Sequence, residues 1–177
     1  MTERLPADQD AREAALEPER SFIVQAPAGS GKTELLTRRF LRLLELVDQP
    51  EEVLAITFTR KAAGEMRDRI LDALGLAESE APPQDGHKRR TWELARAARA
   101  RDLAMEWNLA DSPRRLRVET IDALNAWLAR QLPVSSGIGT APAPSEDPEP
   151  AYRAAARRVL KAAGTDHPAA EPVGKTC

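Results

Sequence analysis

The segment between Ala26 and Thr33 restricts the fold of this chain more than any other part of the sequence, because it reads Ala-Pro-Ala-Gly-Ser-Gly-Lys-Thr. An apolar run of strand type, residues 21–26, leads into it, and residues 34–47 follow it with leucines at helical spacing. Glycines here allow the backbone to curl, so that successive N–H groups point toward one bound anion. The helix that follows adds the positive end of its dipole. The sequence therefore predicts a phosphate-binding loop between a strand and a helix.

The residue types in this loop suit a nucleoside triphosphate. Lys32 can reach the outer phosphates, and Thr33 can offer its hydroxyl to the Mg²⁺ that accompanies them. The pattern is a relaxed P-loop, with Ala26 where glycine is more usual. A glycine-rich turn that only caps a helix is the alternative, and the flanking strand and helix count against it. We expect nucleotide contacts from Ala26, Pro27, Ala28, Gly29, Ser30, Gly31, Lys32 and Thr33.

Strand-type and helix-type segments alternate along the chain. Further apolar strands are predicted at residues 53–58 and 115–120. This alternation is typical of an α/β domain with a parallel sheet, which we place in residues 1–132. A proline-rich connector is predicted for residues 133–150, followed in residues 151–177 by the start of a helical region and a tail without periodicity. Helices are predicted for residues 8–17, 34–47, 60–74, 90–106, 121–131 and 152–163.

Composition excludes several classes of protein. The net charge of −2 gives no general attraction for nucleic acid, so any DNA contact depends on local patches. The one cysteine, Cys177, rules out a disulfide within the chain. No apolar run reaches the ~18 residues of a transmembrane helix, and the charged residues 1–20 do not resemble a signal peptide. We therefore expect a cytoplasmic protein without membrane contact.

Two strand-to-helix junctions carry residues suited to single-stranded nucleic acid. In residues 56–66, Ile-Thr-Phe-Thr-Arg-Lys-Ala-Ala-Gly-Glu-Met, an aromatic ring for base stacking lies beside hydroxyls and basic groups for phosphates. Residues 118–124 read Val-Glu-Thr-Ile-Asp-Ala-Leu. The alternatives are that Phe58 is a core residue and that Asp122 is only a favourable charge at a helix start.

Gln9 lies upstream of the P-loop and is a third candidate. Its amide offers a donor and an acceptor at once, which can read N6 and N7 of adenine. A surface glutamine without a role is the alternative.

Together, in this order, these segments resemble the UvrD/RecB-like superfamily 1 DNA helicases. The resemblance covers roughly residues 5–160, and residues 25–41 and 117–133 are similar to the RecB/AddA branch. It implies a partial RecA-like P-loop NTPase domain, helix-rich and lacking the later strands of its parallel sheet. It also implies an ATP-dependent 3′–5′ DNA helicase or helicase–nuclease of repair or recombination, with DNA and, in some members, a second subunit as partners.

The resemblance assigns roles residue by residue. Gln9 would read the adenine of ATP, and the P-loop would hold the triphosphate with Mg²⁺ bound through Thr33. Glu34 stands where relatives often have arginine, and Asp122 stands where they often have histidine. An ionised carboxylate cannot donate to a phosphate, which weakens the role of Asp122. The single-stranded DNA track would be lined by Thr57, Phe58, Thr59, Arg60, Thr120, Ile121 and Asp122.

Hydrolysis of ATP requires carboxylates that the sequence does not place correctly. In this family an apolar strand ending in Asp-Glu, the Walker B motif, holds the Mg²⁺ shell and helps to position water. Residues 51–52 are glutamates that precede a strand, and the acidic pair at 146–147 lies in the connector. We therefore expect no catalytic residue in this chain, which we interpret as a fragment that is inactive alone.

Other functions remain as alternatives. The chain could be a nucleotide-binding module or a truncated product without motor activity, or its open sheet could prevent stable folding. A P-loop kinase or GTPase-like switch fits less well, because residues 56–66 are unexplained and no Asn-Lys-x-Asp motif is present.

Basic and aromatic residues elsewhere have simpler interpretations. The arginines of residues 38–42 and 89–101 are expected to solvate exposed helix faces. Trp92, Trp107 and Trp127 lie at helical spacing with leucine and alanine, so we expect them to pack rather than to stack on bases.

Overall fold

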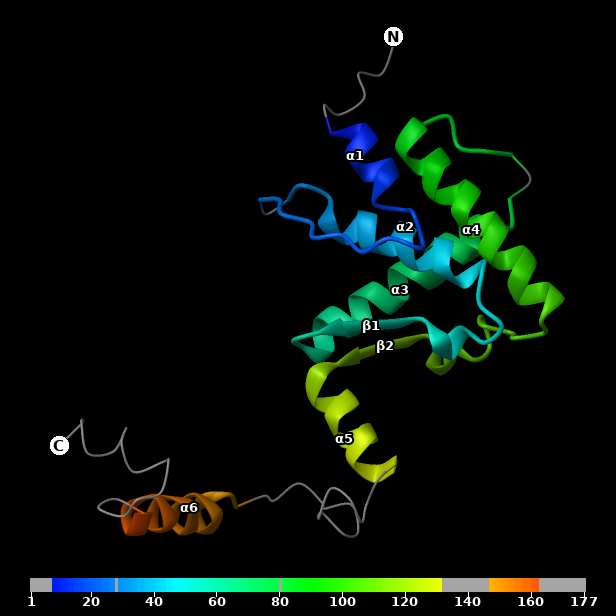
Figure 1. The fold of residues 1–177 in the computed structure, drawn as a ribbon. Helices are drawn as coiled ribbons and strands as arrows, with labels where there is room; N and C mark the ends of the chain where they lie inside the picture. Colours follow the sequence, from blue (N-terminus) through cyan, green and yellow to red (C-terminus); the bar gives the residue numbers. More distant parts are fainter. Residues whose placement is uncertain (1–7, 28, 80, 132–146, 163–177) are drawn as a thin grey trace. The chain divides into compact units, whose positions relative to one another are not determined.

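The computed structural model describes residues 8–27, 29–79, 81–131 and 147–162 (Figure 1). The chain divides between Leu128 and Ala129 into two compact units. Its helix-rich α/β arrangement with a parallel sheet confirms the predicted fold class. The elements in chain order are α1 (Gln9–Ala14), α2 (Lys32–Leu44), the 3₁₀ helix η1 (Pro50–Glu52), β1 (Leu54–Thr57), α3 (Arg60–Leu76), α4 (Gly86–Ala104), the 3₁₀ helix η2 (Pro113–Arg115), β2 (Arg117–Thr120), α5 (Ile121–Gln131) and α6 (Glu149–Ala162).

The strands β1 and β2 pair in parallel, although two α-helices and the 3₁₀ helix η2 separate them in the chain (Figure 1). Leu54 lies opposite Arg117, and Thr57 lies opposite Thr120. A parallel pair requires a long crossover connection, which α3 and α4 supply here. The register places the carboxyl ends of both strands side by side.

Helix α3 covers one face of this sheet. Val118 on that face is 1% exposed, and the guanidinium of Arg67 donates to the Val118 carbonyl oxygen over 2.7 Å. Leu54 and Ile56 point to the opposite face and are 38% and 50% exposed. Within the described residues, α3 thus covers one face of the sheet, and the other face is only partly covered.

Residues 21–27 have no regular secondary structure, so the strand predicted before the P-loop is wrong. In the described part of the chain they pair with neither β1 nor β2, and Ile23 is 99% exposed. A strand is held by hydrogen bonds to a neighbouring strand, and apolar character cannot replace them. Arg39 instead fixes the chain just before this segment by donating to the carbonyl oxygens of Ala15 and Arg20.

The buried core lies where α2, α3 and α4 pack together. Leu41 and Leu44 of α2 and Ile70 of α3 have no solvent exposure. Ala95 and Ala98 of α4 are also fully buried, and their small side chains allow α4 to approach its neighbours closely. The helical spacing of these apolar residues is what places them on one buried side of each helix.

Some arginines of α4 link this helix to distant segments, which corrects the expectation of a solvated face for them, whereas Arg89 and Arg96 are exposed as expected. Arg90 pairs with Glu13 of α1 at 2.7 Å, and Arg101 pairs with Asp48 at 2.8 Å. The hydrogen bond to Glu13 raises the pKa of Arg90 above its ordinary value. These pairs fix the position of α4 against α1 and against the loop after α2.

Arg38 of α2 is buried, again unlike the solvated arginine that the sequence suggested. It is 4% exposed, and its guanidinium donates to Thr91 Oγ1 at 2.9 Å and to the His87 carbonyl oxygen at 2.7 Å. A third hydrogen bond, to Glu34 at 2.6 Å, pairs its charge. A buried charge is tolerable when it is paired and hydrogen-bonded in this way.

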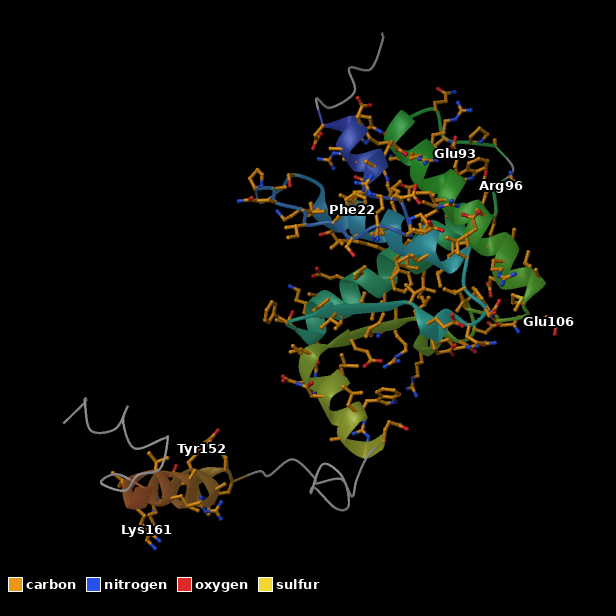
Figure 2. All side chains as sticks on the ribbon, in the orientation of Figure 1. Phe22, Glu93, Arg96, Glu106, Tyr152 and Lys161 are labelled. Carbon is orange, nitrogen blue, oxygen red and sulfur yellow. The ribbon has the colours of Figure 1, made fainter. Side chains whose placement is uncertain are left out.

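The tryptophans differ in how far they pack. Trp107 is 2% exposed, as predicted for a packing residue. Trp92 lies under the guanidinium of Arg96 at 4.9 Å (Figure 2 labels Arg96), and Trp127 lies under that of Arg117 at 4.4 Å. Cation–π contact therefore accounts for the two rings that are not fully buried.

Two helices begin earlier than predicted because an aspartate precedes each of them. Asp85 accepts from the backbone N–H groups of His87 and Lys88, so that α4 begins within the predicted loop. Asp147 accepts from the N–H of Glu149 at the start of α6. Residues 133–146 of the predicted connector and the tail from residue 163 lie outside the described residues. None of the described helices is long and apolar enough to cross a membrane.

Replacing Leu41 by alanine should lower the free energy of unfolding by about 2–5 kcal/mol, because the change leaves a cavity in the core. Leu36→Ala on the same helix, where the side chain is 48% exposed, should change it by less than ~0.5 kcal/mol. Urea denaturation followed by circular dichroism measures both. Equal effects would contradict the described packing of α2.

Candidate nucleotide and nucleic-acid sites

The backbone of the P-loop has the conformation that its glycines were expected to permit. Gly29 and Gly31 have φ values of 75° and 81°, in the left-handed region that favours glycine. Gly31 is the N-cap of α2, and its carbonyl oxygen accepts from the N–H of Leu35 at 3.0 Å. The loop therefore turns directly into the amino end of α2, where backbone N–H groups and the helix dipole favour an anion. Ala28 lies outside the described residues.

Lys32 is the first residue of α2, and its side chain folds back over the loop. Its ammonium donates to the carbonyl oxygens of Ala26 at 2.6 Å and Pro27 at 2.5 Å. Thr33 is exposed in the first turn of α2. Both side chains thus lie at the amino end of α2, where the phosphates and Mg²⁺ of a nucleotide would require them.

A cavity of about 380 Å³ opens between α1, residues 22–26 and the P-loop. Its walls include the cations Arg12 and Lys32 together with Ser30 on the loop side. Phe22, labelled in Figure 2, contributes an aromatic wall together with neighbouring apolar residues. A cavity of this size, mostly apolar with a few convergent polar groups, suits a small ligand such as a nucleotide.

Gln9 does not line this cavity in the described structure. Its amide Nε2 donates to Glu13 at 3.3 Å, and no described residue donates to its buried Oε1. Glu13 is held in turn by Arg90. Recognition of adenine by Gln9 therefore stays a prediction, and it requires the amide to leave Glu13.

Arg12 of α1 is a residue of this site that the sequence reasoning missed. Its Nη2 donates to the Ser30 carbonyl oxygen at 2.8 Å and lies 2.8 Å from Asp8 Oδ2. The hydrogen bond from Arg12 lowers the pKa of Asp8 below its ordinary value and raises the pKa of Arg12 above its own. The one signal in the sequence was the spacing of Asp8 and Arg12 at i and i+4, which predicts an ion pair along one helix but not the contact of Arg12 with the P-loop.

The residues predicted for the DNA track come together at one edge of the sheet. Thr57 at the end of β1 lies directly opposite Thr120 at the end of β2. The Thr57 hydroxyl oxygen lies 3.1 Å from the Thr59 carbonyl oxygen, to which it donates, and 3.4 Å from the Glu119 carbonyl oxygen. Phe58 follows β1 and is 92% exposed, so the alternative that it is a core residue is wrong.

Two of these threonines also have a structural function. The hydroxyl oxygen of Thr59 accepts from the N–H of Ala62 at 3.1 Å and caps α3. That of Thr120 accepts from the N–H of Ala123 at 3.2 Å at the start of α5. Capping of this kind satisfies a backbone N–H group in the first turn of each helix. The residues that follow the caps, Arg60, Ile121 and Asp122, are exposed.

Comparison with known proteins agrees with this geometry. A model of the UvrD/REP helicase N-terminal domain matches residues 7–163. The chain belongs to this UvrD-like helicase family. The match includes the P-loop, both strand ends and α1, so the family assignment covers every segment described above.

Individual relatives match shorter stretches. DNA helicase II of Salmonella typhimurium is 44% identical over 68 residues, which are 38% of this chain and 9% of the relative. The PcrA helicase of Staphylococcus aureus is 48% identical over 64 residues, 36% of this chain and 9% of the relative. An ATP-dependent helicase/nuclease subunit of Clostridioides difficile is 43% identical over 65 residues, which are 35% of this chain and 5% of the relative. The matched stretch is thus less than a tenth of each of these relatives, and no solved structure matches the chain.

Replacing Gly31 by alanine should destabilise the protein by about 1–2 kcal/mol, because an L-residue is strained at this φ. The new Cβ would also lie 3.3 Å from Arg12 Nη1. Gly75→Ala in α3 is the matched control. A Cβ added at Gly75 would meet no atom within 4 Å, and the higher helix propensity of alanine should stabilise the protein by about 0.5–1 kcal/mol. Urea denaturation should therefore show changes of opposite sign in the free energy of unfolding for the two variants. Changes of the same sign would contradict the described conformation of the loop.

Proposed function

We propose that this chain is the ATP-binding portion of an ATP-dependent 3′–5′ DNA helicase, or helicase–nuclease, that acts in DNA repair or recombination. The main support is the P-loop, whose two left-handed glycines lead into α2 in the same unit that carries the in-register ends of β1 and β2. Membership of the UvrD-like family and the names of the relatives, helicases and a helicase/nuclease subunit, agree with this proposal. We place the protein in the cytoplasm.

The nucleotide would bind at the amino end of α2. Backbone N–H groups of residues 29–33 and the Lys32 ammonium would hold the phosphates, and the Thr33 hydroxyl would complete the Mg²⁺ shell. ATP supplies the free energy for movement along DNA when it is hydrolysed. Lys32 must exchange its hydrogen bonds to the Ala26 and Pro27 carbonyls for bonds to phosphate oxygens. Gln9 remains our candidate for reading the base.

A single DNA strand would lie across the sheet edge where Thr57 and Thr120 meet. The exposed ring of Phe58 would stack on a base, and Arg60 would contact a phosphate. Thr59, Ile121 and Asp122 would line the same track. Helix α3 starts at this edge and packs against α2, which starts at the P-loop, so the packed helices connect the two sites.

ATP turnover would need carboxylates beyond those of this chain. No apolar strand of the sequence ends in Asp-Glu, so we propose that the chain binds ATP and Mg²⁺ without hydrolysing them. The second candidate, a nucleotide-binding module without motor activity, rests on the same observation. We also propose that the whole protein associates with a second helicase–nuclease subunit.

The first test is nucleotide binding and turnover by the 177-residue chain. Calorimetry should detect binding of Mg-ATP that Lys32→Ala abolishes, because the ammonium is the main cation facing the outer phosphates. A steady-state assay with and without single-stranded DNA should show no hydrolysis. DNA-stimulated hydrolysis that Lys32→Ala removes would contradict the absence of catalytic carboxylates.

The second test is DNA binding at fixed salt, measured as the fluorescence anisotropy of a labelled oligothymidine. Phe58→Ala should weaken binding by about 1–3 kcal/mol, or roughly 5- to 150-fold, because one base loses its stacking partner. Leu76→Ala removes another exposed apolar side chain, 68% exposed at the end of α3, and should have no effect. Equal losses would mean that the contact is non-specific.

A further inference from the structure

We propose that Arg12 is a second cation that binds the triphosphate, acting beside Lys32 in the same cavity. This inference rests on the proposed binding of ATP. Arg12 comes from α1 and Lys32 from the first turn of α2, and both line the same cavity of about 380 Å³. A guanidinium suits this position because its planar donors can bond two phosphate oxygens at once.

The guanidinium lies against the part of the loop that would hold the phosphates. Nη2 is fixed by the Ser30 carbonyl oxygen at 2.8 Å. Nη1 lies 3.3 Å from the point where a side chain at Gly31 would place its Cβ, a space that only glycine leaves open. The group therefore reaches the loop backbone at the two residues just before Lys32.

Two polar atoms without hydrogen-bond partners lie where α1 meets the P-loop. Arg12 Nε and Ser30 Oγ are both buried, and neither has a hydrogen-bond partner among the described residues. An unpaired buried polar group is costly, and a bound group with acceptor oxygens would satisfy both of these donors. Gln9 Oε1 is also buried without a described partner, but Gln9 does not line the cavity, and its oxygen is an acceptor that a phosphate would not satisfy.

Asp8 opposes this function. Its carboxylate lies 2.8 Å from Nη2 of Arg12 and shares that nitrogen with Ser30. A negative charge here competes with phosphate for the guanidinium, and Glu34 adds a further negative charge nearby. Removing the charge of Asp8 should therefore strengthen binding of an anion, whereas a purely structural ion pair would give the opposite result.

The test measures affinity for Mg-ATP and for magnesium inorganic triphosphate, using the full chain. Arg12→Ala should weaken both by about tenfold or more, as expected for loss of a charge-assisted contact, and Arg12→Lys should recover part of this loss. Asp8→Asn should tighten both, and asparagine preserves a good residue for the helix start. Arg89→Ala is the control, because Arg89 pairs with Glu93 at i+4 on α4 and does not line the cavity. Circular dichroism establishes that each variant folds.

Three results would overturn the inference. If Arg12→Ala binds like the original chain while Lys32→Ala does not bind, the proposed ATP site stands and Arg12 is not part of it. If Arg12→Ala loses affinity for ATP but not for inorganic triphosphate, Arg12 contacts the nucleoside. If Asp8→Asn weakens binding as Arg12→Ala does, the ion pair of Asp8 and Arg12 only stabilises the fold. If the original chain binds no nucleotide at all, the proposed function itself fails.

Discussion

The parallel pairing of β1 with β2 determines where the candidate DNA track lies. Because Thr57 and Thr120 are in register, segments from opposite halves of the first unit end at one edge. Each strand then passes into a helix that a threonine caps, and Phe58, between β1 and α3, is exposed. A slip of one residue would turn Val118 out of the core and move the whole edge out of alignment.

Sequence patterns predicted those features that depend on local chemistry. The glycines of the P-loop and the start of α2 follow from residue type and spacing, and the structure contains both. The exposed position of Phe58 was implied by the family resemblance, because residue type alone left a core position open. The strand expected at residues 21–26 failed because a strand also depends on a neighbouring backbone, which an apolar run does not reveal. Helix starts were missed by a few residues where Asp85 and Asp147 supply caps.

Arginines were the residues least open to prediction. Their charge suggested exposure to solvent or contact with nucleic acid. Arg38 of α2 is instead buried and donates hydrogen bonds to residues of α4, and Arg90 pairs α4 with α1. Which partner a long side chain reaches depends on how helices pack, and that is not encoded by spacing along one helix. Arg12 belongs to the same class: its place beside the P-loop follows from the packing of α1.

The folded-back Lys32 has a consequence for which anions this loop can hold. Two carbonyl oxygens already replace water around its ammonium, so an incoming anion gains only the difference between an ion pair and those hydrogen bonds. A monovalent anion such as chloride gains little from that exchange. A polyphosphate gains more, because it also accepts from several N–H groups of the loop at the same time. If the loop binds nucleotide as proposed, this arrangement of Lys32 would favour a polyphosphate over a small monovalent anion.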